Sequence, residues 1–217
     1  MIVLEQVSKS YPTRHGRKLV LDKIDLTINR GEKIGILGYN GAGKSTLIRL
    51  ISGSEPPSSG TITRRMSISW PIASGGAFQG GLTGLDNVKF ICRVYDVDYR
   101  EILPYIEDFS ELGKFMREPL NIYSRGMKGR LAFAVSLALD FDCYLVDESM
   151  SAGDRRFREK CSEAIMKNTK DRAMVMVSHT DKFIEDFCDR AAILHKGKLK
   201  LFDDVYEAVD EYEARAA

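Results

Sequence analysis

The chain has 217 residues, of which 44% are hydrophobic and 29% charged, so it is long enough for one sizeable domain with its own core. Its 32 Lys and Arg residues balance 31 Asp and Glu residues, giving a formal net charge of +1. General nucleic-acid-binding proteins carry a basic excess, so this balance argues against one. The four cysteines are far apart and form no C-x-x-C pair, which disfavours a disulfide framework or a zinc site.

The N-terminal segment does not have the pattern of a secretory signal peptide, because Glu5 and Lys9 interrupt its apolar residues early. The longest apolar run, "LAFAVSLAL" at 131–139, is about half of the ~20 residues that a membrane-spanning helix needs. We therefore expect a cytoplasmic chain. If the protein works at a membrane, another chain would supply the membrane span.

The first part of the chain predicts a sheet followed by a strand–loop–helix unit. Residues 2–8 and 19–28 alternate apolar and polar side chains, which is typical of antiparallel strands, and a basic loop at 12–18 separates them. The short apolar run 33–38 then predicts a strand, and 44–53 predicts a helix.

The middle of the chain, roughly 72–140, has a different pattern. A glycine-rich loop at 72–84 precedes two segments with helical spacing of apolar residues, 85–97 and 100–113. This predicts a helical subdomain, roughly 83–140, inserted into an α/β core within a single domain covering 1–217.

The last part returns to short apolar runs. Residues 142–149 and 173–179 have the near-continuous apolar character of strands that are buried on both faces. Residues 191–202 predict a hairpin with Gly197 at its turn, and the charged segment 203–217 predicts a terminal helix.

The stretch "GYNGAGKST" fits the phosphate-binding pattern G-x-x-x-x-G-K-[ST]. Its glycines allow backbone N–H groups to surround a polyphosphate, and the following helix points its N-terminus at the phosphates. Lys44 can reach the β and γ oxygens, and Ser45 can bind Mg²⁺. A chance match in a glycine-rich turn is the alternative, and the position between a predicted strand and a predicted helix argues against it. The loop residues are Gly38, Tyr39, Asn40, Gly41, Ala42, Gly43, Lys44, Ser45 and Thr46.

Polar residues also follow the two later buried strands. In "YLVDES", Asp147 and Glu148 follow the apolar residues of the strand. An aspartate there can hold Mg²⁺, and the adjacent carboxylate can take a proton from an attacking water. His179 ends "MVMVSH" and could contact a γ-phosphate. A solvated acidic turn and an ordinary strand-end histidine are the alternatives, and the order of the three motifs along the chain weakens both.

These motifs, together with "YSRGM" at 123–127, resemble the ATP-binding subunits of ABC transporters over nearly the whole chain. The resemblance implies an α/β P-loop NTPase core of ABC type with an N-terminal antiparallel β-subdomain and an inserted helical subdomain. It implies ATP and Mg²⁺ as cofactors and a head-to-tail homodimer, in which each ATP lies between the phosphate loop of one copy and the signature helix of the other.

The same resemblance assigns roles to individual residues. Tyr11 would stack on adenine, while Ser45 and Asp147 would hold the metal. Glu148 would be the general base and His179 the switch histidine. The signature loop would contribute Ser124 and Gly126 to ATP, and Ser124 could equally cap its own helix. The D-loop would be "SAGD" at 151–154.

Two departures from the family pattern point to a particular kind of transporter. The signature loop, usually L-S-G-G-Q, has Arg125 and Met127 at its third and fifth positions. Gln79 lies only three residues before Leu82, so its assignment as the Q-loop glutamine stays open. With "SWPIASGGAFQGGLTGLDNVKF" and "DESMSAGD", these features are similar to the capsular polysaccharide exporters of Gram-negative bacteria.

The resemblance therefore implies the ATP-hydrolysing subunit of an exporter that moves lipid-linked capsular polysaccharide across the inner membrane. Two copies would pair with two separate membrane-spanning permease subunits on the cytoplasmic face. O-antigen and teichoic acid exporters share much of the pattern, and the short C-terminus favours the capsule type. An ABC importer subunit is a further alternative, but importers generally keep the usual signature and Q-loop.

Other functional classes fit less well. A switch GTPase would need N-K-x-D and D-x-x-G motifs, and neither occurs. ATPases that act on nucleic acid or ribosomes usually carry two such domains or a long insertion. Glu148 argues against a scaffold that binds ATP without hydrolysing it.

Overall fold

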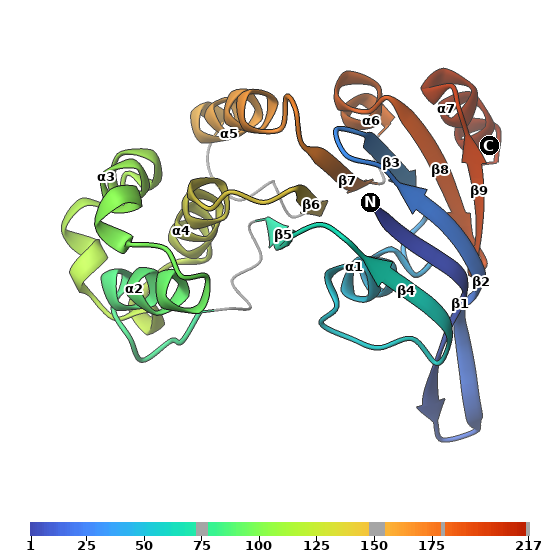
Figure 1. Ribbon diagram of the computed structural model, residues 1–217, viewed down its shortest axis with the longest axis horizontal. Coiled ribbons are helices and arrows are strands. Elements are labelled where there is room, and N and C mark those ends of the chain that lie inside the picture. The colour runs from blue at the N-terminus through green and yellow to red at the C-terminus, as the bar shows by residue number, and fades with distance from the viewer. Residues whose placement is uncertain (73–77, 148–154, 179–180, 216–217) are drawn as a thin grey trace. The chain divides into compact units, whose positions relative to one another are not determined.

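In the computed structural model, which describes residues 1–72, 78–147, 155–178 and 181–215, the chain begins with an antiparallel sheet. Strands β1 (Ile2–Thr13) and β2 (Gly16–Ile28) pair along their length, and β4 (Ser59–Arg64) pairs with the other edge of β1. The strand order is β2-β1-β4 (Figure 1). This confirms the antiparallel sheet that the alternating sequence predicts.

The basic loop predicted at 12–18 is wrong in its extent. Pro12 pairs with Arg17, so the two strands continue almost to the tip of the hairpin. The Thr13 hydroxyl donates to the Gly16 carbonyl at 2.9 Å, and Gly16 has a positive φ of 118°, a conformation that glycine adopts without strain. This local bonding limits the turn to the two residues between Thr13 and Gly16. The basic charge of the segment does not predict so short a turn.

A second, six-stranded sheet has the order β5-β6-β7-β3-β8-β9 (Figure 1). Strands β6, β7, β3 and β8 are parallel, and β9 is antiparallel to β8. Parallel strands are covered on both faces, which explains their near-continuous apolar sequences. The strands are β3 (Lys33–Leu37), β5 (Ile68–Ile72), β6 (Cys143–Asp147), β7 (Ala173–Ser178), β8 (Arg190–His195) and β9 (Lys198–Phe202).

Three helices accompany these sheets: α1 (Lys44–Ser52), α6 (Asp181–Phe187) and α7 (Val205–Ala214). Helix α6 packs on β3 and β7, and α7 packs on β3, β8 and β9. Apolar residues of the antiparallel sheet, α1 and the central strands form one buried core. Together these elements form a first compact unit that comprises residues 1–71, the β6 segment and residues 169–217.

The remaining residues form a second compact unit made of helices, comprising Ile72–Asp140 and α5. Phe109, Phe133 and Phe157 meet in its interior, with ring centroids 5.6–6.4 Å apart. Thr83 and Asp98 cap the first two helices by accepting main-chain N–H bonds. Its helices are α2 (Gly84–Val94), α3 (Tyr99–Ser110), η2 (Gly113–Arg117), η3 (Leu120–Ile122), α4 (Arg125–Ala138) and α5 (Arg155–Asn168).

The predicted strands and helices are confirmed as elements, with ends that differ by a few residues. Strands β4 and β5, helices α5 and α6 and the short 3-10 helices η2 and η3 are found in addition to the predicted elements. Within the ranges that the structure describes, no helix combines the length and apolar character needed to cross a bilayer.

Candidate nucleotide-binding site

The predicted phosphate loop lies between β3 and α1, where close contacts and backbone angles require glycine. Gly41 and Gly43 have φ values of +82° and +112°, which L side chains rarely adopt. A Cβ at Gly38 would lie 2.8 Å from the Leu194 carbonyl oxygen, and one at Gly43 would lie 3.0 Å from the side chain of Leu21. The glycines thus allow the loop to curl closely over the end of the sheet.

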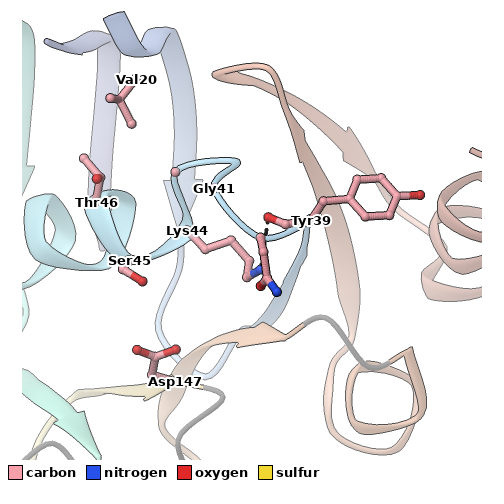
Figure 2. A pocket seen from close by; sticks show the side chains of 9 residues that line it. Val20, Tyr39, Gly41, Lys44, Ser45, Thr46 and Asp147 are labelled. Carbon is pink, nitrogen blue, oxygen red and sulfur yellow. Dashed lines mark hydrogen bonds between the residues drawn. The ribbon is translucent and has the colours of Figure 1, made fainter. Parts of the chain in front are cut away.

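This loop surrounds a cavity of about 250 Å³ (Figure 2). Seven of the nine predicted loop residues line it, together with Asp147 at the end of β6. Val20 of β2 also lines the cavity. Val20 was not predicted as a site residue, because in the sequence it is only one apolar residue of a strand. The lining residues are Val20, Tyr39, Asn40, Gly41, Gly43, Lys44, Ser45, Thr46 and Asp147.

Lys44 begins α1 and is only 8% exposed. Its ammonium group donates to the main-chain oxygens of Gly38 and of Tyr39, the latter at 3.4 Å. Burial lowers the pKa of Lys44, and the charge of Asp147 opposes this effect. The loop therefore stabilises a buried cation with its own carbonyl groups, next to the first turn of α1, whose main-chain N–H groups lack helical acceptors.

Ser45 and Asp147 face each other across the cavity (Figure 2). Burial raises the pKa of Asp147, opposed by the charge of Lys44, so a cation beside this carboxylate would favour its ionised form. In the part of the chain that is described, no cluster of three or more His, Cys, Asp or Glu residues could hold a metal ion. One carboxylate and one hydroxyl fit Mg²⁺, which usually keeps several waters and takes further oxygens from phosphates.

Tyr11 is not among the residues that line the cavity, but hydrogen bonds connect it to the phosphate loop. Its hydroxyl donates to Glu55 at 2.7 Å and accepts from Arg49 at 3.1 Å. The same guanidinium nitrogen of Arg49 donates to the Thr46 hydroxyl at 3.2 Å. The Lys9 ammonium lies 5.3 Å from the centre of the Tyr11 ring. The predicted adenine-stacking residue is thus fixed to α1 through its polar end.

Ser124 and Gly126 lie at the start of α4 in the second unit, whereas the cavity belongs to the first unit. The exposed Ser124 accepts a hydrogen bond from the Met127 N–H at 3.2 Å, so it caps its own helix. The nearest neighbour of a Cβ at Gly126 would be the Ser124 hydroxyl at 3.8 Å, an ordinary van der Waals distance. Arg125 is exposed.

The catalytic residues predicted from the sequence, Glu148 and His179, lie outside the described residues, as does the predicted D-loop. Gln79 is described and exposed. Its main-chain N–H donates to the Asn87 side chain at 2.7 Å, and its carbonyl accepts from the same side chain at 3.1 Å. Asn87 is fully buried, so it holds this loop firmly against α2.

Comparison with known proteins agrees with this geometry. Residues 21–151 match the ABC transporter family. The capsule polysaccharide export ATP-binding protein CtrD of Neisseria meningitidis serogroup B is 54% identical over 99% of both chains. The teichoic acids export ATP-binding protein TagH of Staphylococcus epidermidis is 38% identical over 89% of this chain and 75% of its own length.

A solved structure of the ATP-binding cassette MJ0796, a dimer bound to ADP and Pi, has the same fold. Its TM-score is 0.81, with coverage of 92% of this chain and 97% of that chain at 23% identity. This similarity confirms the predicted α/β fold of ABC type. The family match and the full-length relative also confirm the resemblance noted from the motifs: the chain belongs to the ABC transporter family, among its ATP-binding proteins.

Proposed function

We propose that this chain is the ATP-hydrolysing subunit of an ABC exporter that drives lipid-linked capsular polysaccharide across the inner membrane. The observation that carries the ATPase proposal is the cavity in which Lys44, Ser45 and the first turn of α1 face Asp147. The name of CtrD, a relative over the full length, supports the polysaccharide substrate.

In this proposal the phosphates of ATP occupy the cavity. Main-chain N–H groups at the start of α1 bind the phosphate oxygens. Lys44 exchanges its bonds to the Gly38 and Tyr39 carbonyls for the β and γ oxygens. Ser45 and Asp147 hold Mg²⁺, which supplies charge neutralisation at the transferred phosphoryl group. Glu148 orients and deprotonates the attacking water, and His179 contacts the γ-phosphate.

Tyr11 stacks on adenine in this proposal. Tyr11 is half-buried and the Lys9 ammonium lies over its ring, so a base would stack on the face that Lys9 does not cover. Its hydroxyl bonds to Glu55 and Arg49 would restrict the ring's orientation.

The signature segment acts on the nucleotide of a second copy. Ser124 and the first-turn N–H groups of α4 point at the γ-phosphate held by the partner, so ATP binding closes a homodimer. Arg125 and Met127 are compatible with this role because Ser124 and Gly126 remain at the start of α4.

The export proposal also specifies the partner of the ATPase dimer and its location in the cell. Two integral membrane permease subunits bind the ATPase dimer at the cytoplasmic face of the inner membrane, and the polysaccharide passes through the permease. A teichoic acid or O-antigen exporter is the alternative, and the higher identity and fuller coverage of CtrD compared with TagH favour the capsule type.

The ATPase proposal is tested by steady-state hydrolysis with the purified chain, alone and with its permease. Lys44→Ala should abolish MgATP binding, while Glu148→Gln should bind MgATP but lose turnover. The exposed Lys114→Ala is the matched control and should match the wild type. Wild-type turnover equal to that of Glu148→Gln would contradict the ATPase.

The export proposal needs a separate measurement. In a capsulated host that lacks its own export ATPase, the wild-type gene should restore surface capsule, and the Lys44→Ala gene should leave polysaccharide inside the cell. Restoration by both genes would rule out ATP-driven export by this chain.

A further inference from the structure

Tyr39 has an unusual arrangement for a phosphate-loop residue. Its carbonyl oxygen accepts from the Lys44 ammonium at 3.4 Å and from the Ala42 N–H at 3.0 Å, so its main chain belongs to the cavity wall. Its ring, however, points away from Lys44 and from the cavity (Figure 2). Phosphate binding by main-chain groups needs no aromatic side chain, so the ring must act elsewhere.

The ring of Tyr39 is held by helix α7, which lies more than 160 residues later in the sequence. It stacks on the Tyr212 ring with centroids 4.9 Å apart and 27° between the planes. The Tyr39 hydroxyl also donates to the Tyr212 carbonyl oxygen at 3.2 Å. Because both contacts join the same two residues, together they fix the position of the Tyr39 side chain relative to α7.

Helix α7 can serve as a firm support because it is itself anchored. Tyr212 is only 7% exposed, and Ala208 and Val209 are buried on the same helix. The Asp204 side chain caps the helix by accepting from the Tyr206 and Glu207 N–H groups. The helix packs on β3, the strand that leads directly into the phosphate loop.

We infer that Tyr212 is a positioning residue for the nucleotide site. Through its contacts with the Tyr39 ring, α7 holds the phosphate loop in the conformation that binds the nucleotide. This inference rests on the proposed function, because it concerns the loop proposed to bind ATP. When ATP arrives, Lys44 leaves the carbonyls of Gly38 and Tyr39 for the phosphates, and the loop loses two of its own internal bonds. The contact with α7 keeps the loop in its binding shape during that exchange, which favours affinity because less ordering is left to binding.

A purely structural role for Tyr212 makes a different prediction. If the ring only fills space between α7 and the sheet, its removal lowers the melting temperature but leaves the affinity of the folded protein for MgATP unchanged. A positioning role changes KM for MgATP in protein that is still fully folded.

The experiment measures KM, kcat and equilibrium MgATP binding for the full chain, at a temperature well below each variant's melting transition. Tyr212→Ala should raise KM and the dissociation constant about tenfold, with kcat within about twofold of wild type, as expected for lost stacking and lost orientation of Tyr39. Tyr212→Phe keeps the ring and the main-chain carbonyl and should restore affinity to within about twofold. Tyr206→Ala removes an aromatic ring that is 65% exposed on the same helix, and it should change nothing.

A double-mutant cycle tests the coupling directly. If Tyr212 acts through Tyr39, the combined Tyr39→Ala and Tyr212→Ala variant should bind MgATP no more weakly than Tyr39→Ala alone. Additive losses, or unchanged affinity in folded Tyr212→Ala, would overturn the inference. Should Tyr212→Ala fail to fold, Tyr39→Phe decides, since it removes only the hydroxyl bond: weaker binding supports the inference and equal binding overturns it.

The outcomes separate this inference from the proposed function. Binding that depends on Lys44 but not on Tyr212 leaves the ATPase standing and refutes the positioning role. Binding that does not depend on Lys44 refutes the proposed site itself.

Discussion

Glu55 is the centre of a charged cluster that ties the β1 strand to the end of α1. Its carboxylate pairs with the Lys9 ammonium at 2.9 Å, accepts from the Tyr11 hydroxyl at 2.7 Å and accepts from Arg49 at 3.1 Å. The hydrogen bonds from Lys9 and then Tyr11 are the main reasons why the pKa of Glu55 falls from 4.5 to about 2. We predict that Glu55→Gln destabilises the protein in a pH-dependent manner.

The pKa values set the size of this effect. A shift from 4.5 to about 2 corresponds to an upper limit of ~3.4 kcal/mol, at ~1.36 kcal/mol per pKa unit. The Glu55 side chain is 22% exposed and that of Arg49 is 47% exposed, so water screens part of the attraction. We therefore expect a loss of about 1–2 kcal/mol in the free energy of unfolding at pH 7.

The direction of the pH dependence follows from the lowered pKa. The stabilisation is fully present above the unfolded value of 4.5 and disappears as the pH falls toward about 2, because the folded carboxylate is then protonated as well. Half of it should be lost near the midpoint of the two values, at about pH 3.2. Wild-type stability should therefore converge on that of Glu55→Gln as the solution is acidified.

Urea unfolding of both proteins between pH 7 and pH 3.5 measures this convergence. Each comparison is a difference between two proteins at one pH, so other carboxylates that titrate in this range cancel. Glu163→Gln, an exposed glutamate on α5, is the matched control and should follow the wild type throughout. A constant gap between wild type and Glu55→Gln from pH 7 to pH 3.5 would refute the reasoning.

Four further substitutions test other features. Ser124→Ala removes the α4 cap and should lower the free energy of unfolding by about 1 kcal/mol; a loss of ATPase activity with intact MgATP binding would reveal its added role across a dimer. Gly60→Ala should cost more than ~2 kcal/mol in urea unfolding, because its φ is +82° and a Cβ would lie 2.3 Å from the Gln6 carbonyl oxygen. Gly113→Ala, with a positive φ but open space, should cost only about 1 kcal/mol. Phe133→Ala should cost about 3–5 kcal/mol, measured in the same way, since the buried ring stacks on another aromatic side chain.

Features encoded within a short segment could be predicted from the sequence. The phosphate loop is one, because the spacing of Gly38, Gly43 and Lys44 between an apolar strand and a helix specifies both local backbone and chemistry. The apolar runs that become β6 and β7 are others, since strands covered on both faces need apolar residues at nearly every position.

Contacts between distant segments were not predictable in this way. Nothing near Tyr39 in the sequence indicates that its ring stacks on Tyr212, and nothing near Tyr11 indicates its bonds to Glu55 and Arg49. Helix α5 was missed because only three of its residues are buried, which leaves a weak apolar pattern within a charged segment.

The strand order of the six-stranded sheet has a consequence for biosynthesis. Strand β3 is synthesised early, yet both of its neighbours in the sheet, β7 and β8, come from the last part of the chain. During vectorial synthesis on a ribosome, β3 and the loop that follows it must therefore wait for these partners, whereas the helical unit emerges in between with most of its contacts already made. A nascent chain halted before β7 would thus lack both neighbours of β3, so the nucleotide site can form only after β8 has been synthesised.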